Sequence, residues 1–265
     1  MRLNNNDLLG INEAYDQMPY EKQLESKQQM ISDSLARNLF DITPQKIIEN
    51  PQPLYYRHKV IVSATNVNMK GRNQLRLGLY KEGTKTIIPG VDNHLHDKDI
   101  IQVLKTIEEV LRKYKLEAYS PKYTRGIIKH VLVRKSYQNK SMLVVIVTQG
   151  FIFPNHKQIV KDIRQKHPQI ETVIQNIHHI DTPVVLLENY KTLYGPGYML
   201  DEIEGLKFRI SANSFYQVNP IQMMRLYKEA LTVATIKEND VIMDCYSGIG
   251  TLALLAARKA KEVIA

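Results

Sequence analysis

The residues best suited to chemistry lie near the C-terminus, where an acidic residue is followed by two closely spaced glycines. Asp244 ends the apolar run 241–243, and Gly248 and Gly250 follow it in the pattern D-x-x-x-G-x-G. Glycines permit a tight turn and a close approach of the backbone to a ligand. The Ala- and Leu-rich stretch from Thr251 predicts a helix whose amino end presents free N–H groups to the same point. The pattern predicts a nucleotide-cofactor loop at the carboxyl end of a strand; the alternative is an ordinary strand–turn–helix.

The spacing of this loop resembles the S-adenosylmethionine motif of class I methyltransferases more than the G-x-G-x-x-G of nicotinamide enzymes. In class I methyltransferases the loop surrounds the methionine end of the cofactor. The resemblance implies that residues 205–265 form the beginning of a Rossmann-like domain.

The residue pattern changes twice along the chain and divides it into three regions that must together hold the loop. Residues 1–50 predict an N-terminal helical segment, because apolar side chains recur at three- and four-residue spacings until prolines interrupt them. Residues 51–204 predict a central α+β domain, and residues 205–265 predict the incomplete start of a class I methyltransferase domain. The expected fold class is therefore α/β plus α+β.

Capped helices and short β-branched runs define these regions. One amphipathic helix is predicted over residues 98–115 with Asp97 as its N-cap, and a shorter helix runs from a cap at Asn155 to about residue 165. Another helix is predicted after Asn219, with Pro220 at its first position. The predicted strands of the central domain are HKVIVSAT, QLRLGLY, IIKHVLVRK, SMLVVIVTQ, ETVIQNI and TPVVLLE.

The charge and hydropathy of the chain limit the kinds of partner it can have. The 265 residues include 36 Lys and Arg against 27 Asp and Glu, which gives a net charge of +9. Such a basic excess suits a polyanionic partner, and because the charges are dispersed, any nucleic-acid surface must be assembled by folding. No stretch reaches the ~18 to 20 apolar residues of a membrane span, and the N-terminus lacks the apolar core of a secretory signal. We therefore expect a cytoplasmic protein with no membrane partner.

Thiol and imidazole groups give no sign of a metal centre. Cys245 is the single cysteine, which excludes an internal disulfide framework, a cysteine-based zinc site and an iron–sulfur cluster. The closest histidines, His94 with His96 and His178 with His179, lack the helical i, i+4 spacing of a metal site. We expect surface histidines and no metal.

Two motifs together give the chain a family resemblance. SFYQVNP (214–220), followed by a helix and DCYSGIGT (244–251), is similar to the RNA (uracil-5-)-methyltransferase family, whose members carry S-F-F/Y-Q-x-N and then D-L-Y-C-G-x-G-T/N. The resemblance implies an S-adenosyl-L-methionine-dependent enzyme that methylates C5 of uridine in ribosomal or transfer RNA. It covers most of the chain, because further segments follow the family's order: YEKQLESK, YYRHKV, RGIIKHVLVR, TVIQNI and LYG.

The resemblance also implies roles for the residues of both motifs. Tyr246 is expected to lie against the cofactor. Gln217 is expected to contact the cofactor, since Asn219 already supplies the helix cap; the alternative is a turn residue that satisfies local backbone groups. The implied cofactor-binding residues are Gln217, Asp244, Tyr246, Gly248, Gly250 and Thr251.

The central α+β region is similar to the RNA-binding domain of the family. Basic side chains on or beside its strands could contact phosphates. The alternative for each of them is a solvated face of the sheet. The implied RNA-binding residues are Arg57, Lys59, Arg125, Lys129 and Arg134.

Departures from the family pattern concern the chemical step. The family's reaction needs a cysteine thiolate that attacks uracil C6 and a base that removes the C5 proton. Both groups are expected downstream of the glycine loop, outside this chain, so no catalytic residue is assigned. Cys245 stands at the family's Leu position and is expected to pack at the strand end, and Ser247 replaces the usual motif cysteine. The acid that holds the cofactor ribose is expected just after Ala265, so we expect weak or undetectable cofactor binding.

Three hypotheses follow. The first is an RNA uridine C5-methyltransferase of which this chain carries the central domain and the start of the catalytic domain. The second is a non-catalytic RNA-binding remnant or fragment of such an enzyme, and the third is a class I methyltransferase with another substrate. In each case residues 220–265 have too little sheet to bury their own apolar faces, and we expect them to be poorly ordered or to depend on the rest of the chain.

Overall fold

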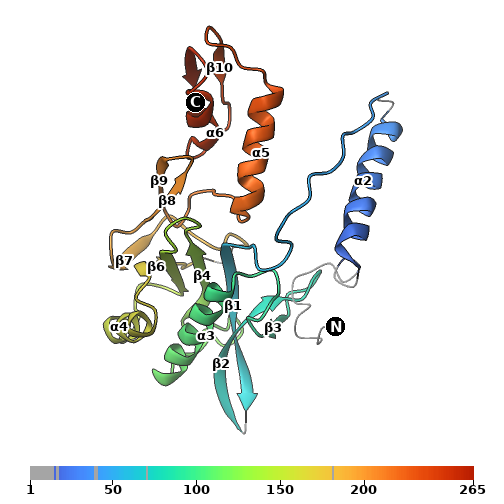
Figure 1. The fold of residues 1–265 in the computed structure, drawn as a ribbon. Helices are drawn as coiled ribbons and strands as arrows, with labels where there is room; N and C mark the ends of the chain where they lie inside the picture. The colour runs from blue at the N-terminus through green and yellow to red at the C-terminus, as the bar shows by residue number, and fades with distance from the viewer. Residues whose placement is uncertain (1–14, 16–17, 39–40, 70, 181) are drawn as a thin grey trace.

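The computed structural model describes residue 15 and residues 18–38, 41–69, 71–180 and 182–265. Its elements form a layered α/β body, with α2 standing to one side (Figure 1). In chain order they are α2 (Tyr20–Arg37), β1 (Lys59–Met69), β2 (Arg72–Tyr80), β3 (Ile87–Pro89), α3 (Lys98–Lys113), β4 (Ile128–Lys135), β5 (Met142–Thr148), α4 (His156–Lys166), β6 (Ile170–Ile177), β7 (Tyr190–Tyr194), β8 (Met199–Ile203), β9 (Leu206–Ile210), α5 (Pro220–Val233), β10 (Val241–Met243), α6 (Thr251–Ala256) and β11 (Glu262–Ile264).

A seven-stranded sheet in the order β3-β2-β1-β4-β5-β6-β7 forms the centre of the described fold. Neighbouring strands are antiparallel except β5 and β6, which run parallel and are connected through α4. Every residue of β5 is buried, as expected of a β-branched strand that is covered on both faces. The strands predicted at β1, β2, β4, β5 and β6 are confirmed.

The strand predicted at TPVVLLE (182–188) is wrong, because these residues have no regular structure. Side chains of β6 and the residues after it take the place of a strand partner. The Asn176 amide donates to the carbonyl of Leu187 at 2.7 Å and accepts from its N–H at 3.0 Å. His178 Nε2 is 2.7 Å from the carbonyl oxygen of Val184. Local side-chain bonds of this kind compete with a strand ladder.

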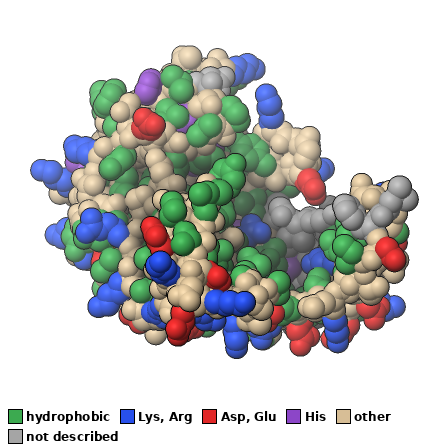
Figure 2. Space-filling view, turned by 90° about the horizontal axis from the view of Figure 1, so that it is seen from above, with side chains coloured by type: hydrophobic (Ala, Val, Ile, Leu, Met, Phe, Trp, Pro, Cys, Tyr) green, Lys and Arg blue, Asp and Glu red, His purple; other side chains and the backbone are tan. Residues whose placement is uncertain are grey.

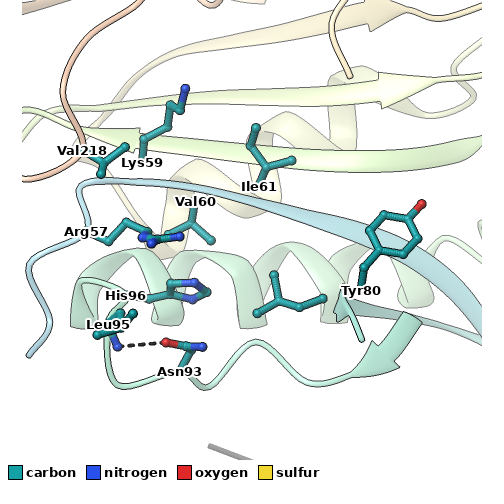
Figure 3. A pocket seen from close by; sticks show the side chains of 10 residues that line it. Arg57, Lys59, Val60, Ile61, Tyr80, Asn93, Leu95, His96 and Val218 are labelled. Atoms are coloured by element: carbon teal, nitrogen blue, oxygen red, sulfur yellow. Dashed lines mark hydrogen bonds between the residues drawn. The ribbon is translucent and has the colours of Figure 1, made fainter. Parts of the chain in front are cut away.

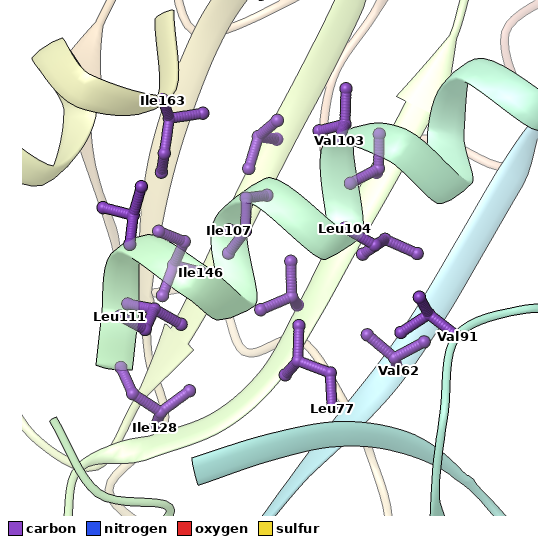
Figure 4. Close-up of a cluster of buried hydrophobic side chains, with 14 of the residues drawn as sticks. Val62, Leu77, Val91, Val103, Leu104, Ile107, Leu111, Ile128, Ile146 and Ile163 are labelled. Atoms are coloured by element: carbon purple, nitrogen blue, oxygen red, sulfur yellow. The ribbon is translucent and has the colours of Figure 1, made fainter. Parts of the chain in front are cut away.

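Helices α3 and α4 cover one face of the sheet. The Asp97 side chain accepts from two backbone N–H groups in the first turn of α3, so this predicted cap is confirmed. The helix ends at Lys113, before the predicted end, and Lys115 has a φ of 55°. Asn155 precedes α4 in a left-handed conformation without a side-chain cap bond, so the capping chemistry predicted there is wrong. The cluster beneath α3 and α4 includes Val62, Leu77, Val103, Leu104, Ile107, Leu111, Ile146 and Ile163 (Figure 4).

The β8–β9 hairpin packs on the other face of the sheet, over β4, β5 and β6. The turn of the hairpin, Glu204–Gly205, lies at the expected boundary between the central and C-terminal regions. Residues from both sides of this turn nevertheless share one core. That second cluster includes Leu132, Leu143, Val145, Ile174, Met199, Ile203, Phe208, Ile210, Met223 and Leu255.

The C-terminal region starts with α5, whose predicted cap is confirmed. Asn219 Oδ1 accepts from the Gln222 N–H at 3.1 Å, and Pro220 occupies the first turn. β10 matches the predicted strand 241–243, α6 begins at Thr251, and β11 pairs in parallel with β10. Side chains of α5 and α6 pack in the second cluster of the sheet, in agreement with the expectation that this region depends on the rest of the chain.

The N-terminal helix α2 is shorter than the predicted helical segment. It ends at Arg37, and residues 41–50 have no regular structure; residues 1–14 lie outside the described part. The Tyr20 hydroxyl accepts from the Asn50 N–H at 2.6 Å, and Gln222 of α5 donates to the Ile48 carbonyl at 3.1 Å. The segment before β1 therefore bridges α2 and α5. None of the described helices has the length and apolarity needed to cross a membrane.

Candidate cofactor loop and RNA-binding surface

The loop after β10 has a backbone that favours glycine. Gly248 has a φ of 58° and Gly250 a φ of 79°, where other residues are strained. The Gly250 N–H donates to the Ser247 carbonyl at 2.7 Å and closes the turn. A Cβ added at Gly248 would meet no atom within 4 Å. Conformation, rather than crowding, therefore favours glycine at this position, and the space beside it is open.

The side chains around the loop differ sharply in exposure. Tyr246 is 98% exposed, whereas Thr251 is buried. Tyr227 of α5 lies beside Asp244 and Thr251: burial raises the pKa of the Tyr227 hydroxyl, the contact with Thr251 lowers it, and the Asp244 carboxylate raises it. Tyr227 therefore contacts Thr251 and lies within the electrostatic influence of Asp244. No sequence pattern singles out Tyr227.

Cys245 is exposed, so the expectation that it packs at the strand end is wrong. β10 belongs to a two-stranded sheet, and its outward residues Val241 and Met243 are exposed as well. Cys245 follows the same alternation. Figure 2 looks onto this end of the molecule and shows hydrophobic side chains exposed among scattered Lys and Arg. No group of three or more His, Cys, Asp or Glu among the described residues could hold a metal.

Gln217 lies in the segment 211–219 between β9 and α5, which is fixed to the central sheet on both sides. The Ser214 carbonyl accepts from Arg134 Nη2 at 2.9 Å, and the Val218 carbonyl accepts from the His58 N–H at 2.8 Å. Gln217 itself is half-buried. Its neighbour Tyr216 belongs to the hydrophobic cluster against which Ile249 of the glycine loop also packs, whereas no hydrogen bond among the described residues joins the Gln217 side chain to the loop.

A buried carboxylate, which sequence analysis missed, anchors this segment. Asp201 of β8 accepts from the Ser136 hydroxyl at 2.7 Å and from the Tyr216 hydroxyl at 3.2 Å. It also accepts from the backbone N–H groups of Tyr137 and Gln138. Burial, followed by the Asp201 charge, raises the pKa of Tyr216 well above its usual range. A single acidic residue in a hairpin has no sequence pattern that would reveal such a role.

Three of the predicted RNA-binding residues lie at one end of β1 and β4. Lys59 and Arg134 are cross-strand partners, and Arg57 and Lys59 line a cavity of about 270 Å³ (Figure 3). Burial lowers the pKa of Lys59, and the nearby Arg134 lowers it further. Arg134 is 2% exposed, so its guanidinium group faces the segment at Ser214 rather than solvent.

The other two lie toward the opposite end of β4. Arg125 is exposed, with Nε 3.7 Å from Glu117 Oε2. Lys129 Nζ is 2.9 Å from His178 Nδ1 and 4.9 Å from the centre of the Tyr119 ring. The five predicted residues therefore form two groups rather than one patch.

Similarity to known proteins covers nearly all of the chain. A protein named uncharacterized RNA methyltransferase from Oceanobacillus iheyensis is 34% identical over 249 residues, which are 93% of this chain and 53% of the relative. One from Lactiplantibacillus plantarum is 34% identical over 247 residues with the same coverage. This chain is a homologue of RNA methyltransferases. It spans about half the length of these relatives, and no family model matches it.

One solved structure shares the fold of this RNA methyltransferase homologue. It is the tRNA (uracil-54, C5)-methyltransferase of Pyrococcus abyssi in complex with S-adenosyl-L-homocysteine, with a TM-score of 0.70 and 16% identity. The match covers 92% of this chain and 55% of that chain. At this identity the match establishes similarity of fold, namely a mixed α/β fold with a large sheet.

Proposed function

We propose that this chain provides the RNA-binding surface and the S-adenosyl-L-methionine loop of an enzyme that methylates C5 of uridine in ribosomal or transfer RNA. The loop itself carries the proposal: an acidic residue at the end of a parallel strand is followed by two glycines with positive φ and a buried threonine. The homology to RNA methyltransferases and the fold shared with a uridine C5-methyltransferase support it.

The groups of the loop fit the methionine end of the cofactor. Asp244 offers a carboxylate to an ammonium group, and the backbone N–H groups of the turn other than that of Gly250, which donates to Ser247, would meet a carboxylate. Tyr246, which is almost fully exposed, offers an aromatic face. Gln217 would add an amide from the segment before α5. When bound, S-adenosyl-L-methionine supplies an electrophilic methyl group.

The chain's proposed contribution is binding and orientation. Activation of uracil C5 needs a thiolate that adds to C6 and a base that accepts the C5 proton. Cys245 lies inside the loop that would hold the cofactor, and we assign it no nucleophilic role. The basic side chains of the central sheet would hold the RNA through its phosphates.

Deletion of the gene that encodes this chain tests the proposal. Modified nucleosides from ribosomal and transfer RNA are then measured by mass spectrometry. We expect 5-methyluridine to disappear from one RNA and to return with the wild-type gene but not with a Gly248→Val gene. Unchanged 5-methyluridine, or loss of a methyl group from another base, would contradict the proposal.

A further inference from the structure

Two cavities beside the central sheet share Tyr80 as a lining residue. The first, of about 270 Å³, is lined by Arg57, Lys59 and Tyr80 among others (Figure 3). The second, of about 510 Å³, is lined by Tyr80 again and by Tyr119, Lys129 and Gln149. We call the surface formed by Arg57, Lys59, Tyr80, Tyr119, Lys129 and Gln149 the Tyr80 track.

The alternation of β1 and β2 explains why Lys59 and Tyr80 share a face. Val60 and Val62 of β1 pack in the cluster beneath α3, so Lys59 points to the other face. Leu77 of β2 packs in the same cluster, so Tyr80 also points away from α3. The hairpin β8–β9 packs over β4 to β6, and Tyr80 on β2 is 47% exposed.

In the second cavity the ammonium group of Lys129 is held in a defined orientation. His178 Nε2 is 2.7 Å from the Val184 carbonyl, which can only accept, so Nε2 carries the proton and Nδ1 is an acceptor. Lys129 Nζ donates to that Nδ1 at 2.9 Å and lies over the Tyr119 ring. Asp181 follows the lining residue Ile180 and lies outside the described residues.

The same cavity holds an acceptor that the protein does not use. Gln149 Oε1 is buried and has no hydrogen-bond partner among the described residues. A buried amide oxygen without a partner costs free energy, so a ligand that donates to it is favoured. The N–H edges of unpaired nucleobases are donors of this kind.

We propose that the Tyr80 track binds a single-stranded stretch of RNA. Its phosphates would contact Arg57 and Lys59, one base would stack on Tyr80, and the next would reach the cavity of Tyr119, Lys129 and Gln149. Aromatic platforms beside basic groups bind unpaired bases, whereas the bases of a duplex remain stacked and inaccessible to such cavities. This inference rests on the proposed function in one respect, namely that the bound nucleic acid is RNA.

Fluorescence anisotropy with a labelled RNA of about ten nucleotides, single-stranded or paired with its complement, tests the track. We expect the wild-type chain to prefer the single strand. Tyr80→Leu should weaken single-strand binding by roughly tenfold, because stacking of one base is lost, and Tyr80→Phe should bind as wild type. Lys59→Met should weaken binding and reduce the dependence of log Kd on log salt concentration by about one. Gln149→Leu should weaken binding without changing that dependence.

Tyr190→Leu provides the matched control. Tyr190 is also an exposed tyrosine, 60% accessible, but it lies on β7 at the other edge of the sheet. Equal losses from Tyr80→Leu and Tyr190→Leu, or equal affinity for duplex and single strand, would overturn the track and leave the proposed function intact. Failure of the wild-type chain to bind any RNA would contradict both.

A second measurement on the wild-type chain covers the case in which a variant fails to fold. A single-stranded RNA that contains 5-iodouridine is photo-crosslinked to the chain, and the attached peptides are identified by mass spectrometry. We expect crosslinks at Tyr80 or Tyr119. Crosslinks confined to α2, α4 or β7 would overturn the proposal.

Discussion

Arg134 of β4 donates from Nη2 to the carbonyl oxygen of Ser214 at 2.9 Å. This contact ties the central sheet to the segment that carries Gln217. The Nε and Nη1 groups of Arg134 are buried without hydrogen-bond partners among the described residues. A guanidinium group in this position loses hydration without full compensation, and burial lowers the pKa of Arg134 to about 10.

Arg134→Met should therefore act locally rather than globally. Removing a poorly compensated buried charge in favour of an apolar side chain is close to neutral, so we expect the free energy of unfolding to change by less than about 1 kcal/mol. The Ser214 carbonyl loses its partner, so backbone amides of residues 211–219 should exchange faster with deuterium. Hydrogen exchange with mass spectrometry measures this. Unchanged exchange in that segment would show that Arg134 does not hold it.

Lys135→Met, one residue away, should destabilise the whole domain. Burial lowers the pKa of Lys135, but hydrogen bonds with Asp97 and Asp99 raise it overall. Its Nζ lies 2.8 Å from Asp97 Oδ2 and 2.6 Å from Asp99 Oδ2. Loss of the ammonium group leaves the α3 cap without its counter-ion, and we expect a loss of about 3 kcal/mol in urea unfolding. A loss equal to that of Arg134→Met would contradict this difference.

The stability of the chain should fall in mild acid because burial lowers the pKa of two histidines, His96 and His130, to about 4. The ordinary value of the histidine pKa is 6.5. The unfolded chain then binds a proton more readily than the folded chain, so this contribution is complete above pH 6.5 and is lost as the pH falls toward 4. The full contribution of His96 is roughly 3 kcal/mol.

Urea unfolding of His96→Phe and wild type at a series of pH values tests this prediction. The variant should lose less stability than wild type over the acid range. His179→Gln, which changes an exposed histidine, should follow the wild-type curve. Parallel curves for wild type and His96→Phe would show that His96 is not a source.

Gly248→Val should impair cofactor binding more than it impairs folding. Gly83 is a matched control, because it also has a positive φ, 68°, and no atom within 4 Å of an added Cβ. Both substitutions introduce the same backbone strain, on the order of 1–2 kcal/mol. Only Gly248→Val places a side chain in the open space of the loop. Amide NMR titration with S-adenosyl-L-methionine in the millimolar range should show at least a several-fold loss of affinity for Gly248→Val alone; equal affinities would speak against the loop as the site.

The sequence pattern predicted a helix start correctly where the capping side chain bonds to backbone groups of the same helix. Asp97 and Asn219 cap α3 and α5 as expected, because a capping side chain acts within three residues. Asn155 was predicted in the same way, but its backbone is left-handed and its side chain makes no capping hydrogen bond. The segment 182–188 contains β-branched residues, yet the side chains of Asn176 and His178 bond to its backbone groups. Such contacts between distant segments cannot be predicted from the residues of one segment.

The candidate site divides in the same way. The glycines of the loop could be recognised from the sequence because a backbone with positive φ favours glycine. The roles of Tyr227 and Asp201 could not be predicted, because they depend on which segments meet in the fold. The same is true of Tyr80, which lines two cavities. Arg134 was expected as an RNA contact because it is a basic residue on a predicted strand of the region that resembles the family's RNA-binding domain, but its burial depends on the segment that covers it.

The most direct test of the account is a titration of the isotopically labelled chain with S-adenosyl-L-homocysteine, followed by two-dimensional amide NMR. Binding is expected to be weak, so the ligand must reach the millimolar range, on the order of 1–5 mM. We predict that amide shifts concentrate at residues 244–251 and at Gln217. Shifts confined to the central sheet would contradict the assignment of the loop as the cofactor site.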